Sequence, residues 1–259
     1  MKIRVLGCSG SETPGRNLSC FLLDGRVLFD AGSATSTLGI DEQMKLEAVF
    51  LTHAHLDHVR AVPFLADNIF FKRKGSSIKV AALPFVLKNI KKHLLNGVIW
   101  PDFTSIPSAD NPVLEFMELR EGNAYRIKKY SVTPYRVSHS IPAAGYLVED
   151  GKGKSFFYSG DTGPARQTWK RLGSRERKRP LDCLLIEVSL PDRMEKEALE
   201  LGHLTPSLLK KELEAMDRPP SRICVTHIKP FFTATIKREL KKLGIKGLSL
   251  LVEGEEITV

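Results

Sequence analysis

The residues best suited to chemistry in this chain lie in one short segment, residues 52–58, with the sequence Thr-His-Ala-His-Leu-Asp-His. Three imidazoles and one carboxylate within six positions are a density that metal coordination explains more readily than an ordinary solvated loop does. The apolar run at 46–51 predicts a strand that ends near Leu51. On an extended or tightly turned continuation, His53 and His55 project to the same side, so both can hold one ion.

Asp57 and His58 follow at the point where we expect a helix to begin. Adjacent side chains in the first turn of a helix diverge by roughly 100°, so this pair can reach past the first ion toward a second. A carboxylate also suits a helix start, where it meets free N–H groups and the positive end of the helix dipole. The opposing interpretation is a histidine-rich loop that binds metal only adventitiously, and matching ligands elsewhere in the chain would argue against it.

Candidate ligands recur downstream, at the ends of predicted strands. His139 follows a strand expected at 131–137 and would be the third nitrogen on the first ion. Asp161 lies in a glycine-flanked turn after another strand, which suits a bridging carboxylate. His227 follows a strand expected at 223–226 and would complete the second ion. Each of these residues alone would be weak evidence, because a single His or a Gly-Asp pair after a strand is usually structural. Together with the first segment, His53, His55, Asp57, His58, His139, Asp161 and His227 are the candidate ligands of a dinuclear centre, and their joint assignment rests on a resemblance of the whole set to a known family.

Nitrogen and oxygen ligands without thiolates suit Zn²⁺, Mn²⁺ or Fe, and zinc is the default among them. Two such divalent metal ions, roughly 3.5–4 Å apart, can share a water, lower its pKa and clamp both oxygens of an in-line displacement at phosphorus. This chemistry would serve hydrolysis of a phosphodiester. Asp57 would ligate one ion and also orient the bridging hydroxide.

His203 lies just before a predicted helix and has no metal role in this arrangement. The leaving alkoxide of a phosphodiester needs a proton, and histidine is well suited to supply one near neutral pH. A structural histidine at a helix entrance is the alternative. We favour His203 as a catalytic acid that acts beside Asp57.

The sequence His-Ala-His-Leu-Asp-His at 53–58 resembles the signature of the metallo-β-lactamase superfamily. This resemblance implies an α/β fold of the α+β kind, a four-layer αββα sandwich with a dinuclear metal site at one edge, used mostly for hydrolysis. It also implies that Asp30 supports the metal loop rather than ligating an ion. No composition break marks a linker, so we expect a single domain over 1–259.

Further blocks make the chain similar to the class II cyclic nucleotide phosphodiesterases within that superfamily. They lie at 96–103, 137–140, 144–146, 159–163 and 202–206. The resemblance implies hydrolysis of the 3′ ester bond of cyclic AMP or cyclic GMP to the 5′-monophosphate. The chain departs from the family at 59–67, where Arg60 and Pro63 could reshape the rim of the pocket.

Three residues in these blocks, Asn96, Trp100 and Thr205, are our candidates for substrate binding. Trp100 lies in a loop with a second aromatic ring, where it could stack on a base, a contact that contributes roughly 1–3 kcal/mol. The usual role of a loop aromatic is instead to cover the core, and that alternative stays open.

Two other functions remain open from the sequence. A ribonuclease Z-like enzyme that processes the 3′ end of transfer RNA would share the dinuclear site, but such enzymes usually extend a Gly-rich arm, and the region between His58 and His139 has three glycines. The net charge of +9 keeps RNA open as a partner, although clusters of Lys and Arg are more often solvated surfaces. The third possibility is a metal-bearing binding protein without turnover, and the intact ligand set together with His203 argues against it.

With 259 residues and 42% hydrophobic content, the chain can bury a substantial core. No apolar stretch approaches the roughly 18 residues of a membrane span, and the first residues indicate a strand rather than a signal peptide. The four cysteines lack C-x-x-C spacing and are expected to be reduced core residues. We therefore expect a cytoplasmic protein without a membrane partner, and a homodimer is one of the assembly states that the sequence allows.

Apolar periodicity predicts helices as well as the strands already named. The Thr-Pro pair at 205–206 is typical of a helix start, because proline is tolerated in the first turn. The expected helices lie at 59–66, 85–95, 164–172, 205–216 and 233–243.

Overall fold

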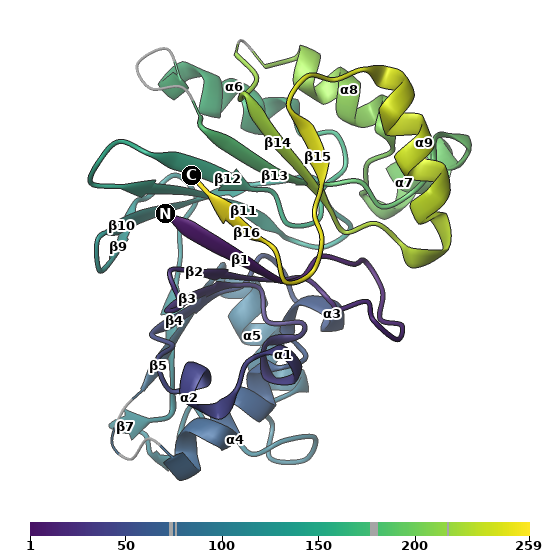
Figure 1. The fold of residues 1–259 in the computed structure, drawn as a ribbon. Helices are drawn as coiled ribbons and strands as arrows, with labels where there is room; N and C mark the ends of the chain where they lie inside the picture. Colours follow the sequence, from purple (N-terminus) through teal and green to yellow (C-terminus); the bar gives the residue numbers. More distant parts are fainter. Residues whose placement is uncertain (73–74, 76, 177–180, 217) are drawn as a thin grey trace.

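The computed structural model of the protein describes residues 1–72, 75, 77–176, 181–216 and 218–259. Two β-sheets face each other, and helices cover the outer face of each, so the layers follow the order αββα (Figure 1). The four-layer sandwich expected from the sequence is therefore confirmed. The predicted ligands follow strand ends, so the position of these ends in the two sheets decides whether the ligands meet.

The first sheet contains β1 (Lys2–Gly7), β2 (Cys20–Leu23), β3 (Val27–Phe29), β4 (Ala48–Phe50), β5 (Ile78–Ala82), β8 (Leu114–Glu118) and β16 (Glu256–Thr258). The strands follow the order β16-β1-β2-β3-β4-β5-β8. β3, β4, β5 and β8 run parallel to one another, so their carboxyl ends meet at one edge of the sheet. This is the edge from which the ligand segment leaves β4.

The second sheet contains β9 (Tyr125–Ile127), β10 (Tyr130–Arg136), β11 (Ala144–Asp150), β12 (Ser155–Tyr158), β13 (Cys183–Glu187), β14 (Arg222–Thr226) and β15 (Leu248–Leu250). The strands follow the order β15-β14-β13-β12-β11-β10-β9, and the four from β12 to β15 are parallel. A separate two-stranded ribbon pairs β6 (Pro107–Ser108) with β7 (Asn111–Pro112). The second sheet therefore also has one edge at which several carboxyl ends meet.

The outer face of the first sheet carries α1 (Ala34–Thr37), α2 (Ile40–Gln43), α3 (Leu56–Val59), α4 (Val62–Lys72) and α5 (Pro84–His93). The second sheet carries α6 (Arg166–Glu176), α7 (Glu195–Leu201), α8 (Pro206–Glu214) and α9 (Thr233–Leu243), with the 3₁₀ turns η1 (Asp192–Met194) and η2 (Pro230–Phe232). The helix expected at 233–243 is confirmed as α9. The short α7 was not predicted.

The helix expected at 59–66 has the wrong bounds. The chain forms α3 up to Val59, turns at 60–61 and continues as α4 to Lys72. Pro63 lies in the first turn of α4, where its missing N–H would have no helical partner in any case. The break separates the ligand segment on α3 from the longer helix that packs on the sheet.

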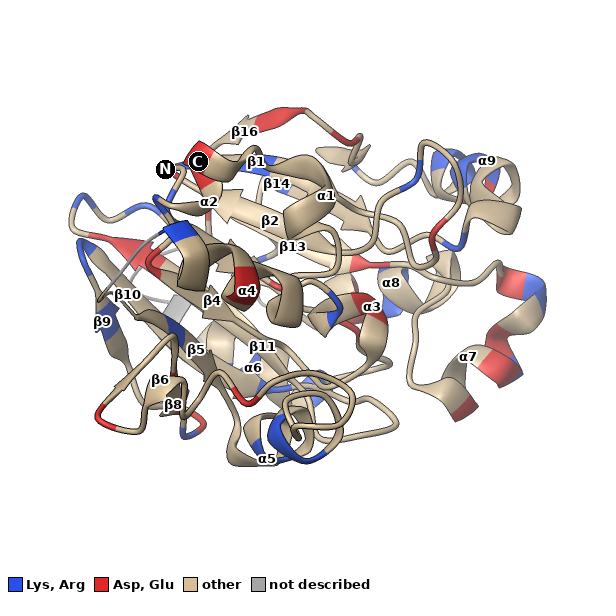
Figure 2. Cartoon of the chain, turned by 90° about the horizontal axis from the view of Figure 1, so that it is seen from below, with Lys and Arg blue, Asp and Glu red and all other residues tan. Residues whose placement is uncertain are grey.

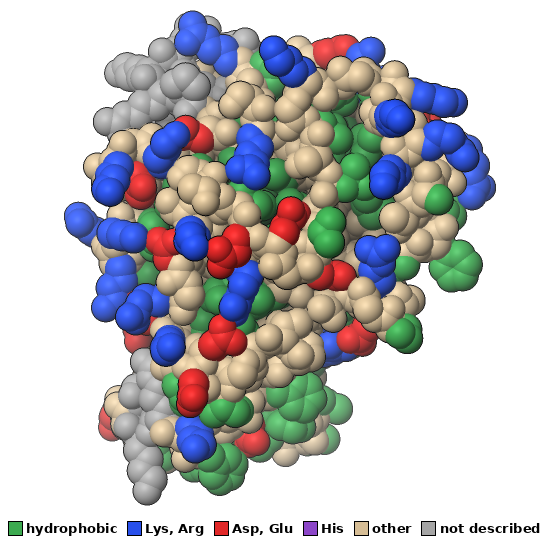
Figure 3. All heavy atoms as spheres, viewed as in Figure 1, with side chains coloured by type: hydrophobic (Ala, Val, Ile, Leu, Met, Phe, Trp, Pro, Cys, Tyr) green, Lys and Arg blue, Asp and Glu red, His purple; other side chains and the backbone are tan. Residues whose placement is uncertain are grey.

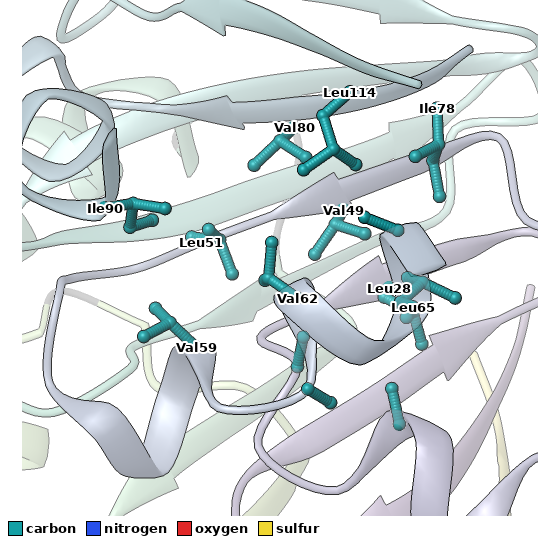
Figure 4. Close-up of a cluster of buried hydrophobic side chains, with 14 of the residues drawn as sticks. Leu28, Val49, Leu51, Val59, Val62, Leu65, Ile78, Val80, Ile90 and Leu114 are labelled. Carbon is teal, nitrogen blue, oxygen red and sulfur yellow. The ribbon is translucent and has the colours of Figure 1, made fainter. Parts of the chain in front are cut away.

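Packing on both faces holds the end of β4 in place. Val49 and Leu51 belong to a buried cluster with Val62 and other side chains of α3 and α4 (Figure 4). On the opposite face, the ring of Phe50 meets the ring of Tyr146 edge-on at 5.4 Å. The hydroxyl of Tyr146 also donates to the carbonyl oxygen of Leu51 at 2.6 Å. The ligand segment therefore starts from a fixed point in a close-packed interior.

The cysteines behave as the sequence predicted, because Cys8, Cys20, Cys183 and Cys224 are all free and buried. Burial raises the pKa of the Cys8 thiol to about 12, so this side chain stays neutral and is a poor metal ligand. None of the described helices combines the length and the apolar character that a membrane crossing requires.

Candidate metal centre

The predicted ligands lie on segments that follow strands of both sheets. The four ligands at 53–58 follow β4 of the first sheet. His139 follows β10, Asp161 follows β12 and His227 follows β14, all in the second sheet. These strand ends meet at one edge of the sandwich, where α/β proteins commonly place their ligands. The structure therefore brings all the predicted ligands together.

The donor atoms form two adjacent groups, and within each group they lie within 4.8 Å of one another. In the first group, Nε2 of His139 lies 3.2 Å from Nδ1 of His55. In the second group, Nε2 of His227 lies 3.3 Å from Oδ2 of Asp57. The full groups are His53, His55 and His139, and Asp57, His58, Asp161 and His227.

Asp161 reaches both groups with its two carboxylate oxygens. Oδ1 lies 3.3 Å from Nε2 of His58 and 3.3 Å from Nε2 of His227. Oδ2 lies 3.8 Å from Nε2 of His53 in the first group. A carboxylate in this position can bridge two cations, which is the role expected for it from the sequence.

Asp30 fixes the orientation of two of the imidazoles. Thr52 Oγ1 donates to Asp30 at 3.0 Å, so it accepts from Nδ1 of His53, also at 3.0 Å. Nδ1 of His58 donates to Oδ2 of Asp30 at 2.7 Å, and the hydroxyl of Tyr158 donates to the same oxygen at 2.7 Å. These bonds leave Nε2 of each ring facing the centre. Asp30 therefore supports the metal loop, as the resemblance implied.

Two further imidazoles are oriented by the second sheet. Nδ1 of His139 donates to the carbonyl oxygen of Gly202 at 2.9 Å. Nδ1 of His227 lies 2.9 Å from Oγ of Ser189, which donates to the buried carboxylate of Glu187 at 2.7 Å. Both rings therefore also present Nε2 to the centre, and hydrogen bonds of this kind fix the tautomer that binds a metal.

Two buried ligand atoms show whether these residues fit a metal. Nε2 of His53 and Oδ1 of Asp161 have no hydrogen-bond partner among the described residues. A buried acceptor without a partner costs about 1–3 kcal/mol, and cations between the two groups would satisfy both atoms. The residues therefore fit divalent ions that bind nitrogen and oxygen.

The protonation states point the same way for these two residues. Burial lowers the pKa of His53 well below its ordinary value, and the neighbouring imidazole of His58 lowers it further. Burial would raise the pKa of Asp161, but the imidazoles of His227 and His58 outweigh burial and hold it well below the ordinary value. A neutral imidazole and an ionised carboxylate are the forms that bind metal.

His58 differs, because the charges of Asp161 and Asp30 outweigh its burial and raise its pKa well above the ordinary value. A proton on His58 therefore competes with a cation for Nε2, and metal affinity at the second group should weaken in acid.

Gly32 lets the chain pass directly against the ligand segment. A Cβ atom at this position would lie 2.1 Å from the carbonyl oxygen of Asp57, closer than non-bonded atoms approach. We expect Gly32→Ala to displace Asp57 and to weaken metal affinity roughly 10- to 100-fold, measured by equilibrium dialysis. Gly151→Ala is the matched control, because a Cβ there would meet nothing within 4 Å. Equal affinities in the two variants would contradict this prediction.

His203 lies next to both groups of ligands. Its ring centroid is 5.2 Å from that of His139 and 5.7 Å from that of His227. Nδ1 lies 2.6 Å from Oε1 of Glu187, a fully buried carboxylate. Burial disfavours the imidazolium, but the charge and the hydrogen bond of Glu187 outweigh burial and raise the pKa of His203. A raised pKa keeps a proton available on this ring, as an acid requires.

Glu187 is the site residue that the sequence analysis missed. It ends β13, after the apolar run Cys-Leu-Leu-Ile, and forms a third set of donors with His203 and His227. Its Oε1 also accepts from the N–H group of Thr162 at 3.0 Å, one residue beyond Asp161. A carboxylate that ends a fully buried strand was the available signal, because the parallel neighbours β12 and β14 are also followed by ligands.

Two of the substrate-binding candidates already use their polar groups inside the protein. Oδ1 of Asn96 accepts from the N–H groups of Val98 and Ile99 at 3.0 and 2.8 Å, so this amide shapes its own exposed loop. Thr205 caps α8, where its hydroxyl accepts from the N–H group of Leu208 at 3.3 Å. Thr205 is 0% exposed, which leaves no surface for a substrate and corrects the expectation of direct contact.

Trp100 covers part of the core but keeps some exposed surface. Its half-buried ring lies 5.0 Å from that of Phe64 on α4 and packs against the cluster under the first sheet. Its Nε1 is buried and has no partner among the described residues. The covering role that the sequence left open is therefore real, and part of the residue stays exposed.

Comparison with known proteins agrees with this geometry. A family model described as "Beta-lactamase superfamily domain" matches residues 25–228. A 3′,5′-cyclic-nucleotide phosphodiesterase of Aliivibrio fischeri is 25% identical over an alignment of 287 positions, gaps included, that covers 87% of this chain and 80% of that protein. A ribonuclease Z of Haloferax volcanii is 29% identical over 160 residues, which cover 59% of this chain and 48% of that protein.

Among solved structures, unliganded yeast PDE1 has the same fold, with a TM-score of 0.84 over 100% of this chain and 99% of that chain at 19% identity. The family model spans most of the chain and includes every predicted ligand. This protein therefore belongs to the β-lactamase superfamily and is a hydrolase of the metallo-β-lactamase fold.

Proposed function

We propose that the protein is a dinuclear-metal phosphodiesterase that hydrolyses 3′,5′-cyclic nucleotides, cyclic AMP or cyclic GMP, to 5′-monophosphates. The observation that carries the proposal is the carboxylate of Asp161, which spans two groups of inward-facing donors. The Aliivibrio fischeri relative that is named a cyclic-nucleotide phosphodiesterase, 80% of which is covered, supports this choice of substrate.

The metal ions would be held by His53, His55 and His139 on one side and by Asp57, His58 and His227 on the other, with Asp161 between them. Zn²⁺ is the default, with Mn²⁺ or Fe as alternatives. Bound ions of this kind act as Lewis acids on the phosphoryl oxygen and lower the pKa of water to about 7.

Two side chains would orient the attacking water and protonate the leaving group. The second oxygen of Asp57 would orient the attacking water by accepting a hydrogen bond from it. His203 would donate a proton from Nε2 to the 3′ oxygen as it leaves, because Nδ1 is held by Glu187. The hydrogen bond to Glu187 both fixes the ring and stabilises its charged form, so the proton is held ready beside the ligands.

Charge around the centre favours a small substrate over a polynucleotide. α7 leads directly to His203 and carries Glu195, Glu197 and Glu200 with one lysine among them, so it keeps a negative charge although Glu195 and Glu200 pair with Lys211 and Lys196 (Figure 2). On the face seen in Figure 3, where no histidine is visible, Lys and Arg side chains lie among carboxylates rather than in one stripe. An RNA strand across the centre would meet the carboxylates of α7, whereas a cyclic nucleotide would not need to cross them.

The deciding experiment is an assay of the purified protein, loaded with Zn²⁺ or Mn²⁺, on four substrates in parallel. These are cyclic AMP, cyclic GMP, a precursor transfer RNA with a 3′ trailer and a chromogenic phosphodiester. We expect both cyclic nucleotides to yield 5′-monophosphates. Cleavage of the RNA alone would instead assign the ribonuclease Z-like function, and two bound metals without any cleavage would assign a binding protein.

Trp100 is the candidate for base recognition that the structure leaves available. We expect Trp100→Ala to raise KM for cyclic AMP about tenfold while kcat changes little, because stacking on a base contributes to binding and not to the chemical step. The chromogenic ester carries no base, so its KM should not change. Ile99→Ala, at the exposed neighbour, is the matched control. Unchanged KM for cyclic AMP would leave Trp100 with its core role alone.

A further inference from the structure

Lys229 lies two residues beyond the ligand His227, at the start of η2. Its side chain is half-buried, and Nζ donates to the carbonyl oxygen of Gly10. Gly10 packs against the ligand ring, because a Cβ atom there would lie 2.9 Å from Nδ1 of His227. The backbone N–H group of Lys229 donates to the carbonyl oxygen of Ser189 at 3.3 Å. The hydroxyl of the same serine orients the ring of His227. The ammonium group is therefore next to the second group of ligands.

The ammonium of Lys229 has N–H donors that no described residue uses. Within the described part of the chain, Gly10 is its one hydrogen-bond partner, and no carboxylate oxygen lies within 4.0 Å of it. A lysine has three N–H donors, so two remain for a ligand. Arg60 provides a contrast, because it lies two residues beyond the ligand His58 but pairs with the carboxylate of Glu12.

The charge of Lys229 also acts on the catalytic side of the centre. It opposes the rise in the pKa of His203, so it lies within electrostatic reach of the acid. Two divalent ions would carry four positive charges, and the carboxylates of Asp30, Asp57, Asp161 and Glu187 would carry four negative charges. The ammonium of Lys229 therefore adds a positive charge that an anionic ligand would neutralise.

We propose that Lys229 is a phosphate-binding residue of this centre, and that it takes a non-bridging oxygen of the substrate and of the 5′-monophosphate product. The proposal rests on the proposed phosphodiesterase function and specifies how the site holds its anion. An ammonium binds phosphate as a point charge, so it favours the dianionic product over the monoanionic diester. Lys229 should therefore strengthen product inhibition as well as substrate binding.

The test compares Lys229→Gln with wild-type protein, both loaded with metal. Glutamine keeps an N–H donor for Gly10 but has no charge. We expect the dissociation constant of inorganic phosphate, measured by calorimetry, to rise about tenfold. The inhibition constant of 5′-AMP should rise by at least as much, KM for the diester by less, and metal content should not change. Lys154→Gln, at a lysine that pairs with Asp182, should change each quantity by less than about twofold.

Lys229→Arg separates charge from packing, and it should restore most of the phosphate affinity. Phosphate binding by Lys229→Gln that is as tight as in the wild type would overturn the proposal, even if the wild type proves to be a phosphodiesterase. Lys229→Arg that binds as weakly as Lys229→Gln would also overturn it. A wild type that cleaves no phosphodiester, with phosphate binding still weakened in Lys229→Gln, would support the phosphate site and defeat the proposed function instead.

Discussion

Asp161→Asn is expected to abolish turnover and to lower the metal retained by the purified protein. Asparagine keeps the size of the side chain but removes the charge between the two groups of donors and replaces one ligating oxygen with an amide nitrogen. Without that charge the two cations would repel each other across a short distance. We expect a loss on the order of 10³-fold or more in kcat, equivalent to about 4 kcal/mol of barrier.

Metal ions per chain, measured by elemental analysis after desalting, should fall in step with kcat. Asp182→Asn is the matched control, because Asp182 lies just before β13 and bonds to Lys154 and Ser155. That variant should keep both its metal and its activity. His227→Ala should resemble Asp161→Asn. An Asp161→Asn protein that retains two ions and most of its turnover would show that Asp161 does not bridge.

His203→Ala is expected to slow hydrolysis of cyclic nucleotides by roughly 10²- to 10⁴-fold while sparing metal content, because it removes the acid and no predicted ligand. The loss should depend on the leaving group. A chromogenic ester releases an acidic phenol that needs no proton, so its hydrolysis should change far less. Full activity of His203→Ala on cyclic AMP would contradict the acid role.

The pH dependence provides a second measurement of the same role. An acid must be protonated to act, so kcat/KM for cyclic AMP should be highest below the pKa of His203 and fall as the pH rises through it. Glu187 raises that pKa, since its charge outweighs burial. Glu187→Gln should therefore move the falling limb to lower pH. If the falling limb did not move in Glu187→Gln, the limb would report the titration of a residue other than His203.

Much of the centre could be predicted because the ligands sit in local patterns. The segment at 53–58 carries four ligand residues between a strand end and a helix start. The geometry of these two elements fixes the directions in which the four side chains point. His139, Asp161 and His227 each follow an apolar run, and this pattern predicts that they lie at strand ends. The parallel order of β12, β13 and β14 then brings two of them to one edge.

What the sequence could not supply depends on contacts between distant segments. Glu187 becomes part of the site because β13 lies between β12 and β14, an adjacency that no local pattern gives. Thr205 shows the opposite case: its local pattern correctly predicted a helix start, and the same cap uses up the hydroxyl assigned to substrate. The break at 60–61 was missed because an apolar run hides a turn between two short helices.

Asp30 has a consequence that reaches beyond catalysis. Tyr158 donates to the carboxylate that also holds His58, and its ring lies 4.9 Å from Phe21 in the packing between the sheets. Natural selection therefore cannot vary the interior of the sandwich and its working edge independently. A substitution that moves Tyr158 should therefore also disturb His58 and weaken metal affinity at the second group of ligands.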